Sequence, residues 1–300
     1  MQNFKLYSLV FPLLLSFYFC GDTYAQAVIL NTRTTTFDAP TIDDGTAEGF
    51  SFTDGDFVNY DLDTSVTSLF LPEVFPKLNL SGFGGNPLNP DALSVRGDGS
   101  FVFSSRLGIT VNGQVFGQQD LIQYNPNTNQ SSSLFRQQGF DIAGIAIREN
   151  GNYLLTGKSD LEGFGINNPD FSFSVGDVIE WNPETGLLTT FFSHENFVET
   201  AAVASIDALE LVDGKLLFST TNAARIVDSD LELEQAGVYA YDLETGEVST
   251  FFDPDLITTP SSDLKSFSLL PTATIPEPSS AIFGLIAMLW GSTVRRRKSC

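Results

Sequence analysis

The stretch FVNYDLDT at residues 57–64 recurs as LIQYNPNT at 121–128, VIEWNPET at 178–185 and VYAYDLET at 238–245. The fourth residue of every copy is Tyr or Trp, and successive copies lie about 60 residues apart. Each copy begins with apolar residues and continues into Asn, Asp, Pro, Glu and Thr residues, which are typical of turns, and a second apolar run follows. Each copy therefore predicts a β-hairpin.

A second hairpin is predicted ahead of three of these copies. Its turns are marked by Gly97-Asp98-Gly99, Asn150-Gly151 and Asp213-Gly214, which accept positive φ angles at low cost. Two hairpins per period form a four-stranded antiparallel blade, the unit of a β-propeller. The sequence therefore predicts an all-β, propeller-like repeat of about four units of roughly 60 residues.

The repeat starts with the second half of one unit and ends with the first half of another. We expect one blade to be split between the two ends, with a strand near residues 267–270 pairing with strands around residues 28–37. An open β-solenoid or a curved stack of sheets is the alternative arrangement.

The first 25 residues have the pattern of a secretory signal peptide. Lys5 supplies the positive charge, Leu9–Phe19 is an apolar run, and Ala25 is a small residue suited to cleavage before Gln26. The apolar run is too short for a membrane-spanning helix. A lipoprotein signal at Cys20 is disfavoured, since the bulky residues Tyr18 and Phe19 precede it.

The C-terminal segment at residues 273–300 has three parts. A helix-breaking Pro-Glu-Pro motif precedes an apolar stretch, about residues 279–294, which we expect to form a transmembrane helix, and a basic cluster follows at residues 295–298. The repeat domain is then expected to span residues 26–272. The residues that define the motif and the basic cluster are Pro276, Glu277, Pro278, Arg295, Arg296 and Arg297.

This three-part tail resembles the PEP-CTERM sorting signal of bacterial exosortase substrates. The resemblance implies export, cleavage by signal peptidase and exosortase, and transient anchoring in the inner membrane by the C-terminal helix. It also implies a final place at the cell surface or in an extracellular exopolysaccharide or biofilm matrix. An ordinary tail-anchored helix is the alternative. The repeat is also similar to those of secreted bacterial surface proteins, through Ser205-Ile206-Asp207-Ala208-Leu209 and Gly97-Asp98-Gly99-Ser100.

Composition excludes several function classes. A formal charge of −22 argues against nucleic acid as a partner, because phosphate recognition requires clustered Lys and Arg. One His and two Cys are too few for a Cys/His zinc site. Both cysteines, Cys20 and Cys300, lie in the terminal segments, so cysteine catalysis is not expected. His194, the single histidine, is expected in a solvent-exposed loop, and no catalytic residue is predicted.

Acidic loops leave calcium as a possible ligand, although no cofactor is expected. The loops at residues 157–177 and 220–237 carry the candidates Asp170, Asp177, Asp228 and Asp230, but no known calcium-loop spacing occurs, and a solvated acidic face is the simpler interpretation. Asp91, Asp141 and Asp207 are expected to cap turns at strand starts, and Asn125, Asn182 and Asp61 to form turns. The recurring aromatics Tyr60, Tyr124, Trp181 and Tyr241 are expected to pack across strands rather than to form a sugar-stacking platform.

These observations predict an exported protein with a non-enzymatic binding or structural role in the envelope or the exopolysaccharide matrix. Its partners would be signal peptidase and exosortase during processing, and then an extracellular polysaccharide or a surface protein. The alternative is a calcium-dependent lactonase- or hydrolase-like propeller enzyme that uses Glu or Asp near the central axis.

Overall fold

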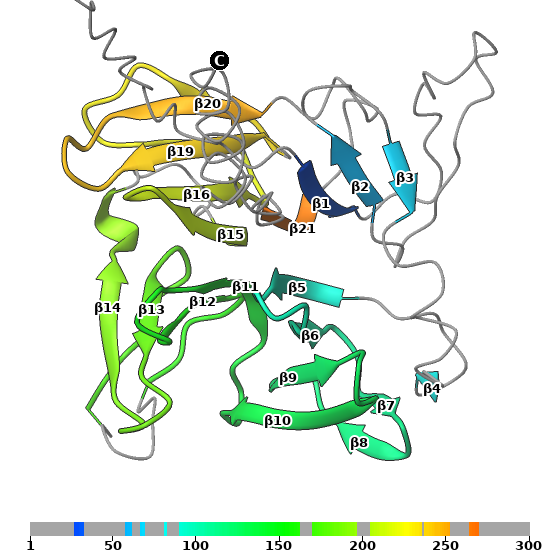
Figure 1. Ribbon diagram of the computed structural model, residues 1–300. Helices are drawn as coiled ribbons and strands as arrows, with labels where there is room; N and C mark the ends of the chain where they lie inside the picture. Colours follow the sequence, from blue (N-terminus) through cyan, green and yellow to red (C-terminus); the bar gives the residue numbers. More distant parts are fainter. Residues whose placement is uncertain are drawn as a thin grey trace, which may run out of the picture.

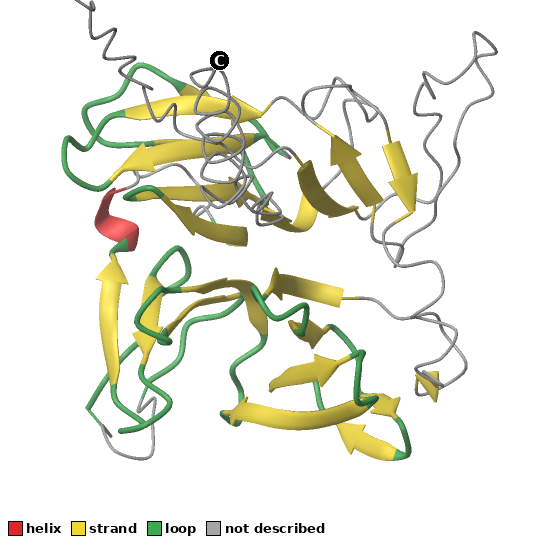
Figure 2. Ribbon diagram, viewed as in Figure 1, coloured by secondary structure: helices red, strands yellow, loops and turns green. Residues whose placement is uncertain are grey.

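The computed structural model describes residues 27–32, 58–61, 67–69, 81–82, 90–162, 170–196, 205–235, 237–252 and 264–269. Figure 2 shows that strands dominate this part of the chain, with one short 3₁₀ helix, η1 (His194–Asn196), among the described residues. The predicted all-β fold of antiparallel sheets is confirmed. The expected signal peptide and C-terminal sorting segment lie outside the described residues. No helix in the described ranges has the length and apolar content needed to cross a membrane.

Three four-stranded sheets are each built from two hairpins that follow one another in the chain (Figure 1). Sheet II consists of β5 (Pro90–Val95), β6 (Phe101–Ser105), β9 (Asp120–Asn125) and β10 (Gln130–Arg136). Sheet III consists of β11 (Ile142–Ile147), β12 (Tyr153–Gly157), β13 (Val178–Trp181) and β14 (Leu188–Phe192). Sheet IV consists of β15 (Ile206–Val212), β16 (Lys215–Thr220), β19 (Val238–Asp242) and β20 (Val248–Phe252).

The remaining four-stranded sheet, sheet I, joins strands from both ends of the described chain. It consists of β21 (Leu264–Leu269), β1 (Ala27–Thr32), β2 (Val58–Asp61) and β3 (Thr67–Leu69). β1 and β21 pair antiparallel, with Val28 opposite Leu269 and Leu30 opposite Phe267. This is the pairing that the interrupted repeat predicts.

The innermost strands of the four sheets form a ring. β5 contacts β11, β11 contacts β15, β15 contacts β21, and β21 contacts β5 again. Figure 1 shows these four strands near the centre, with the other strands of each sheet lying farther out. Antiparallel sheets arranged around a common centre are the hallmark of a propeller-like repeat fold.

Smaller elements are inserted between the two hairpins of a sheet. Between β6 and β9 lies the hairpin of β7 (Ile109–Val111) and β8 (Gln114–Phe116), on which β4 (Ser81–Gly82) pairs. Between β16 and β19 lies the short pair of β17 (Ala224–Arg225) and β18 (Glu232–Leu233). The repeat therefore varies in the connection between the second and third strands of a sheet.

All four innermost strands carry a bulge near their start. The ladder register slips between Pro90 and Ala92, between Ile142 and Gly144, and between Ile206 and Ala208, and β21 shows the same slip against β1. The bulged residues are Asp91, Ala143, Asp207 and Lys265. A bulge bends a strand and increases its twist, which suits a strand at the crowded centre of a ring.

This register corrects the prediction that Asp91, Asp141 and Asp207 play one turn-capping role. Asp91 and Asp207 are buried at bulges, whereas Asp141 precedes β11. Asp91 forms an ion pair with Lys158, at 2.6 Å, and Asp207 accepts a hydrogen bond of 2.8 Å from Ser219 Oγ. Asp91 and Asp207 therefore lie at bulges inside strands and not at turns, and they bind the side chains of Lys158 and Ser219.

The predicted turn formers behave as expected where the structure describes them. Oδ1 of Asn125 accepts hydrogen bonds from the backbone N–H groups two and three residues later, and Oδ1 of Asn182 does the same. Asp242 repeats this geometry in sheet IV. The side chain of Asp61 lies outside the description. These side chains fix the second hairpin of sheets II, III and IV.

The recurring aromatics pack into the core. Trp181 is 7% exposed, and its ring centroid lies 5.3 Å from that of Tyr153 and 5.0 Å from that of Phe135. Tyr124 is buried, and Tyr241 contacts Phe192 edge-on at 5.1 Å. The packing interpretation is confirmed for these three positions, while the side chain of Tyr60 is not described.

Candidate functional site

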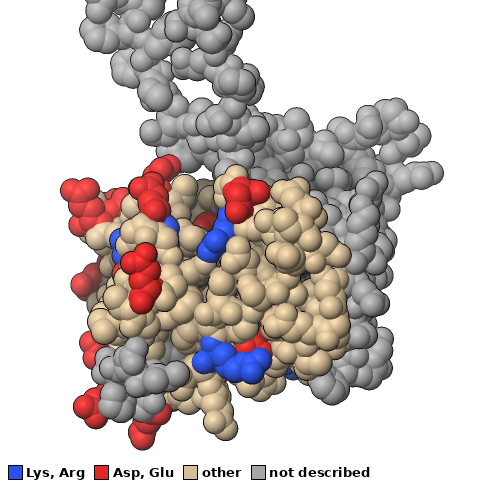
Figure 3. All heavy atoms as spheres, turned by 60° about the horizontal axis from the view of Figure 1, so that its bottom comes forward, with Lys and Arg blue, Asp and Glu red and all other residues tan. Residues whose placement is uncertain are grey.

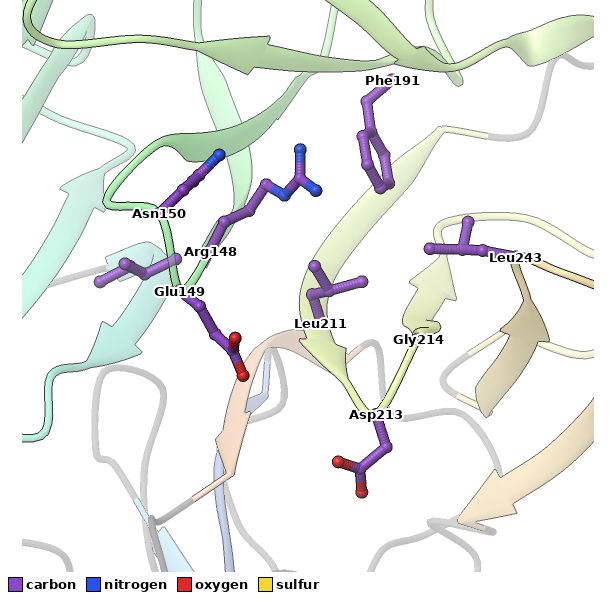
Figure 4. A pocket seen from close by; sticks show the side chains of 9 residues that line it. Arg148, Glu149, Asn150, Phe191, Leu211, Asp213, Gly214 and Leu243 are labelled. Carbon is purple, nitrogen blue, oxygen red and sulfur yellow. The ribbon is translucent and has the colours of Figure 1, made fainter.

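A groove of about 660 Å³ opens between sheets III and IV. Figure 4 shows the side chains that line it, which come from the end of β11 and the β11–β12 turn, from β14, from β15 and the β15–β16 turn, and from the residue after β19. Its lining residues are Ile147, Arg148, Glu149, Asn150, Phe191, Leu211, Asp213, Gly214 and Leu243. The hairpin turns that define the repeat thus also form the walls of this groove.

Local backbone geometry sets the two turns in place. In the β11–β12 turn, Gly151 has a φ of 83° and its N–H donates to the carbonyl of Arg148 at 2.9 Å. In the β15–β16 turn, Asp213 and Gly214 have φ angles of 48° and 75°, the pair of positive values that a two-residue hairpin of type I′ requires. The N–H of Leu243 donates to the carbonyl of Gly214 at 3.1 Å, which ties sheet IV's second hairpin to its first.

The cation of the groove is already neutralised. Arg148 Nη1 lies 2.6 Å from Glu180 Oε2, and its guanidinium lies over the ring of Phe191, 5.2 Å from the centroid. Burial pushes the pKa of Glu180 up, but the hydrogen bond from Asn152 and the Arg148 charge outweigh it, so this pKa lies below its ordinary value. Arg148 and Glu180 therefore remain a charged pair at neutral pH.

Two further carboxylates give the groove a negative rim. Glu149 and Asp213 are exposed, and both carboxylates point toward the lower part of the view in Figure 4. Leu211, Leu243 and Phe191 supply the apolar surface between the turns, and Leu243 remains 39% exposed. An apolar surface with carboxylates at its edge suits a ligand that combines nonpolar area with hydrogen-bond donors or positive charge.

The calcium candidates are not brought together. Asp170, Asp228 and Asp230 are exposed, whereas Asp177 is 6% exposed and accepts hydrogen bonds from the backbone N–H groups of Ser174 and His194. Within the described ranges, no three His, Cys, Asp or Glu side chains are grouped so that they could hold a metal ion.

His194 has a more defined place than an exposed loop residue. It begins η1, its side chain is 38% exposed, and its Nδ1 lies 2.7 Å from Oδ1 of Asp177. The same carboxylate oxygen accepts the backbone N–H of His194 at 2.7 Å. Asp177 therefore anchors the segment that follows β14, and the sequence pattern did not indicate this pairing.

The groove and one buried acid were missed by the sequence analysis. Glu210, on β15, is 8% exposed and lies among apolar neighbours in the strand. The sequence signal that could have indicated this buried acid is a single Glu in the apolar run Ala208-Leu209-Glu210-Leu211. Figure 3 shows many other acidic side chains spread over one side of the visible face, with a few basic residues between them.

Comparisons with known proteins do not assign a family. No protein-family description matches the sequence, and no curated protein matches it. Solved structures with local similarity include TolB from Acinetobacter baumannii (8% identity, 77% of this chain and 42% of that chain, TM-score 0.33). A second is the extracellular domain of the putative hybrid two-component system BT4673 from B. thetaiotaomicron (15% identity, 68% and 30%, TM-score 0.30).

A third similar structure is a chain of a nidogen/laminin complex (9% identity, 81% of this chain and 98% of that chain, TM-score 0.35). The chain spans less than half the length of TolB and of the BT4673 domain. Similarity at this level carries no argument about fold or function. The description of the fold rests instead on the sheet order and the ring of innermost strands described above.

Proposed function

We propose that this chain is an exported protein, sorted by exosortase, with a non-enzymatic binding or structural role in the envelope or the exopolysaccharide matrix. In this account, signal peptidase removes residues 1–25, and the C-terminal helix anchors the chain in the inner membrane until processing at the Pro-Glu-Pro motif. The β-domain then reaches the cell surface or the extracellular matrix.

One observation supports this proposal above the others. The first strand that the structure describes begins at Ala27, directly after the expected cleavage site between Ala25 and Gln26, and the last one described ends at Leu269, shortly before Pro276. These two strands pair with each other in sheet I. Both cleavages would therefore leave every described strand of the ring in place, including the β1–β21 pair that closes it.

The groove between sheets III and IV is the binding surface that we propose for this domain. It combines apolar area from Leu211, Leu243 and Phe191 with the carboxylates of Glu149 and Asp213. The pyranose rings of a polysaccharide offer both C–H faces and hydroxyl donors, which such a surface can contact. A surface protein is the other partner class expected from the sequence.

The alternative of a calcium-dependent lactonase or hydrolase has no specific observation in its favour. It requires carboxylates grouped around a metal ion near the axis, and the described residues hold no such group. Of the buried acids, Asp120 is paired with Arg136, Asp177 with His194 and Asp91 with Lys158. Glu210, on the innermost strand β15, is also buried but belongs to no metal-binding group of side chains among the described residues. A binding role is therefore the function that the geometry supports best.

Fractionation of the producing cells tests the proposal. The wild-type chain, a variant ending after residue 272 and the substitution Glu277→Ala would be followed with an antibody against the β-domain. A matched control is Glu247→Ala, on the exposed turn before β20. We expect wild type and the control at the surface or in the medium without the basic cluster, the Glu277→Ala chain in the inner membrane, and the truncated chain released without anchoring. Wild-type protein that keeps residues 295–298 in a soluble intracellular fraction would refute the sorting proposal.

A further inference from the structure

The centre of the ring contains a carboxyl group that the proposed function does not use. Glu210 lies on β15, the innermost strand of sheet IV, and is 8% exposed. Counted from the shared bulge, the equivalent positions on the other innermost strands are Ser94, Ala146 and Ser268, and all three are buried. An acid thus stands where the other sheets have a small, uncharged side chain.

The hydrogen bonds of Glu210 connect two of these strands. Its Oε1 accepts the backbone N–H of Leu211 at 3.1 Å, and its Oε2 accepts Ser268 Oγ–H at 3.1 Å. The backbone N–H of Leu269 also donates to this carboxylate. Ser268 Oγ in turn accepts the N–H of Val95, on β5, at 3.2 Å.

The inner edges of the innermost strands explain these hydrogen bonds. An innermost strand has a neighbour on one edge only, so alternate backbone N–H groups point toward the axis without a sheet partner. Val95, Leu211 and Leu269 occupy equivalent positions on β5, β15 and β21, and each donates its N–H to Ser268 or Glu210. The two side chains therefore accept hydrogen bonds from the backbone of three of the four innermost strands.

We propose that Glu210 is a proton-dependent latch that holds the closing strand β21 against β15. When the carboxyl is protonated, its burial costs little and β21 stays docked. When it loses the proton, a charge must remain in the buried centre unless β21 detaches and admits water. β21 is the strand that leads toward the sorting segment, so the latch would act where the domain joins its anchor.

The surroundings of Glu210 support this account. Leu217 lies opposite Glu210 in the ladder, and Ser268 donates a hydrogen bond to it. Ser94 and Ala146 occupy the equivalent positions on β5 and β11, and none of these four side chains carries a charge. Burial raises the pKa of Glu210 to about 7, against the opposing effect of its hydrogen bonds from Leu211, Ser268 and Leu269. In an open, hydrated centre the pKa would return to its ordinary value of 4.5.

The sign and size of the effect follow from these two values. The closed form binds the proton more tightly than the open form, so closure is strongest below pH 4.5 and weakens as pH rises toward 7. Each pH unit in that window weakens closure about tenfold, and the effect levels off above the pKa of the closed form. Between pH 5 and pH 8 the closure constant should fall on the order of 50- to 100-fold.

Hydrogen exchange of the β21 amides, residues 264–269, tests the latch in the full chain purified in a neutral detergent. Protection would be corrected for intrinsic exchange and compared at pH 5 and pH 8 for wild type, Glu210→Gln, Ser268→Ala and the exposed control Glu244→Gln. We expect protection in wild type and the control to fall on the order of 50- to 100-fold, and protection in Glu210→Gln to stay constant. Ser268→Ala should lower protection at both pH values and keep the pH dependence.

Two results would overturn the proposal. One is an equal change with pH in wild type and Glu210→Gln, which would place the titration elsewhere. The other is a parallel loss of protection in β21 and in the buried strand β12, which would make the carboxyl a determinant of whole-domain stability and not of β21 docking.

Discussion

Truncation of Phe267 to alanine tests whether β21 closes the ring. Phe267 is 1% exposed and packs in one cluster with Ala208, Leu217, Val238 and Ala240 of sheet IV. Replacement of a buried Phe by Ala costs roughly 3–5 kcal/mol, since apolar contacts are lost and a cavity remains. For a domain of this size that corresponds to a fall in Tm of roughly 6–20 °C.

The assay is urea and thermal unfolding, followed by the fluorescence of the buried Trp181 and by circular dichroism. Phe218→Ala serves as a positive control, because Phe218 is fully buried on β16. Leu187→Ala, at a side chain that is 48% exposed, should change the free energy of unfolding by less than about 0.5 kcal/mol. If Phe267→Ala behaves like Leu187→Ala, then β21 does not dock and the closed ring is refuted.

Two further variants test a buried ion pair and the groove. Asp120→Ala should lower the free energy of unfolding by about 3 kcal/mol at pH 7. The substitution removes a fully buried carboxylate that pairs with Arg136, and it leaves the other hydrogen-bond donors to that carboxylate unsatisfied. Burial raises the pKa of Asp120, but its hydrogen bonds lower it further, so the pKa lies below 3.8. The stabilisation by this carboxylate is therefore lost as pH falls below 3.8. In urea unfolding, the difference in unfolding free energy between wild type and Asp120→Ala should be smaller at pH 2 than at pH 7. Leu243→Asp, in the groove, should weaken co-sedimentation of the protein with surface polysaccharide purified from the producing cells and change Tm by no more than a few degrees. The matched control is Leu187→Asp, at an exposed side chain outside the groove. Equal binding by both variants would argue against the groove as the binding surface.

The hairpins could be predicted from the sequence because their information is local. Asn125 and Asn182 form their turns through hydrogen bonds to residues two and three positions away. Asp213 and Gly214 adopt positive φ angles, which these two residue types accept at low cost in a tight turn. The pairing of β1 with β21 was also predictable, since an interrupted repeat leaves two half-units that complete each other.

The bulges and the centre of the ring could not be predicted in this way. A bulge shifts the register by one residue, so Asp91 and Asp207 align with Ala143 and not with Asp141, although the sequence suggests one series of aspartates. The role of Glu210 depends on backbone N–H groups of β15 and β21, which meet only in the folded ring.

The groove was hidden for a similar reason. Its walls come from turns about 60 residues apart, at Arg148 in sheet III and at Asp213 in sheet IV, and each turn taken alone is an ordinary hairpin. Phe191 lies at a bulge where the ladder between β13 and β14 skips one residue, and its ring lies beneath the Arg148 guanidinium, a contact that the sequence pattern did not indicate.

Mass spectrometry of the terminal peptides tests most directly the central claim, that the chain is exported and cleaved at both ends. The protein would be recovered from the surface or the medium of its own cells. We expect an N-terminal peptide that starts at Gln26 and a C-terminal peptide that ends at or next to Pro276-Glu277-Pro278, with strands β1 and β21 both retained. A mature chain that still carries Met1 or the cluster Arg295-Arg296-Arg297, or one cut within residues 27–269, would contradict the account.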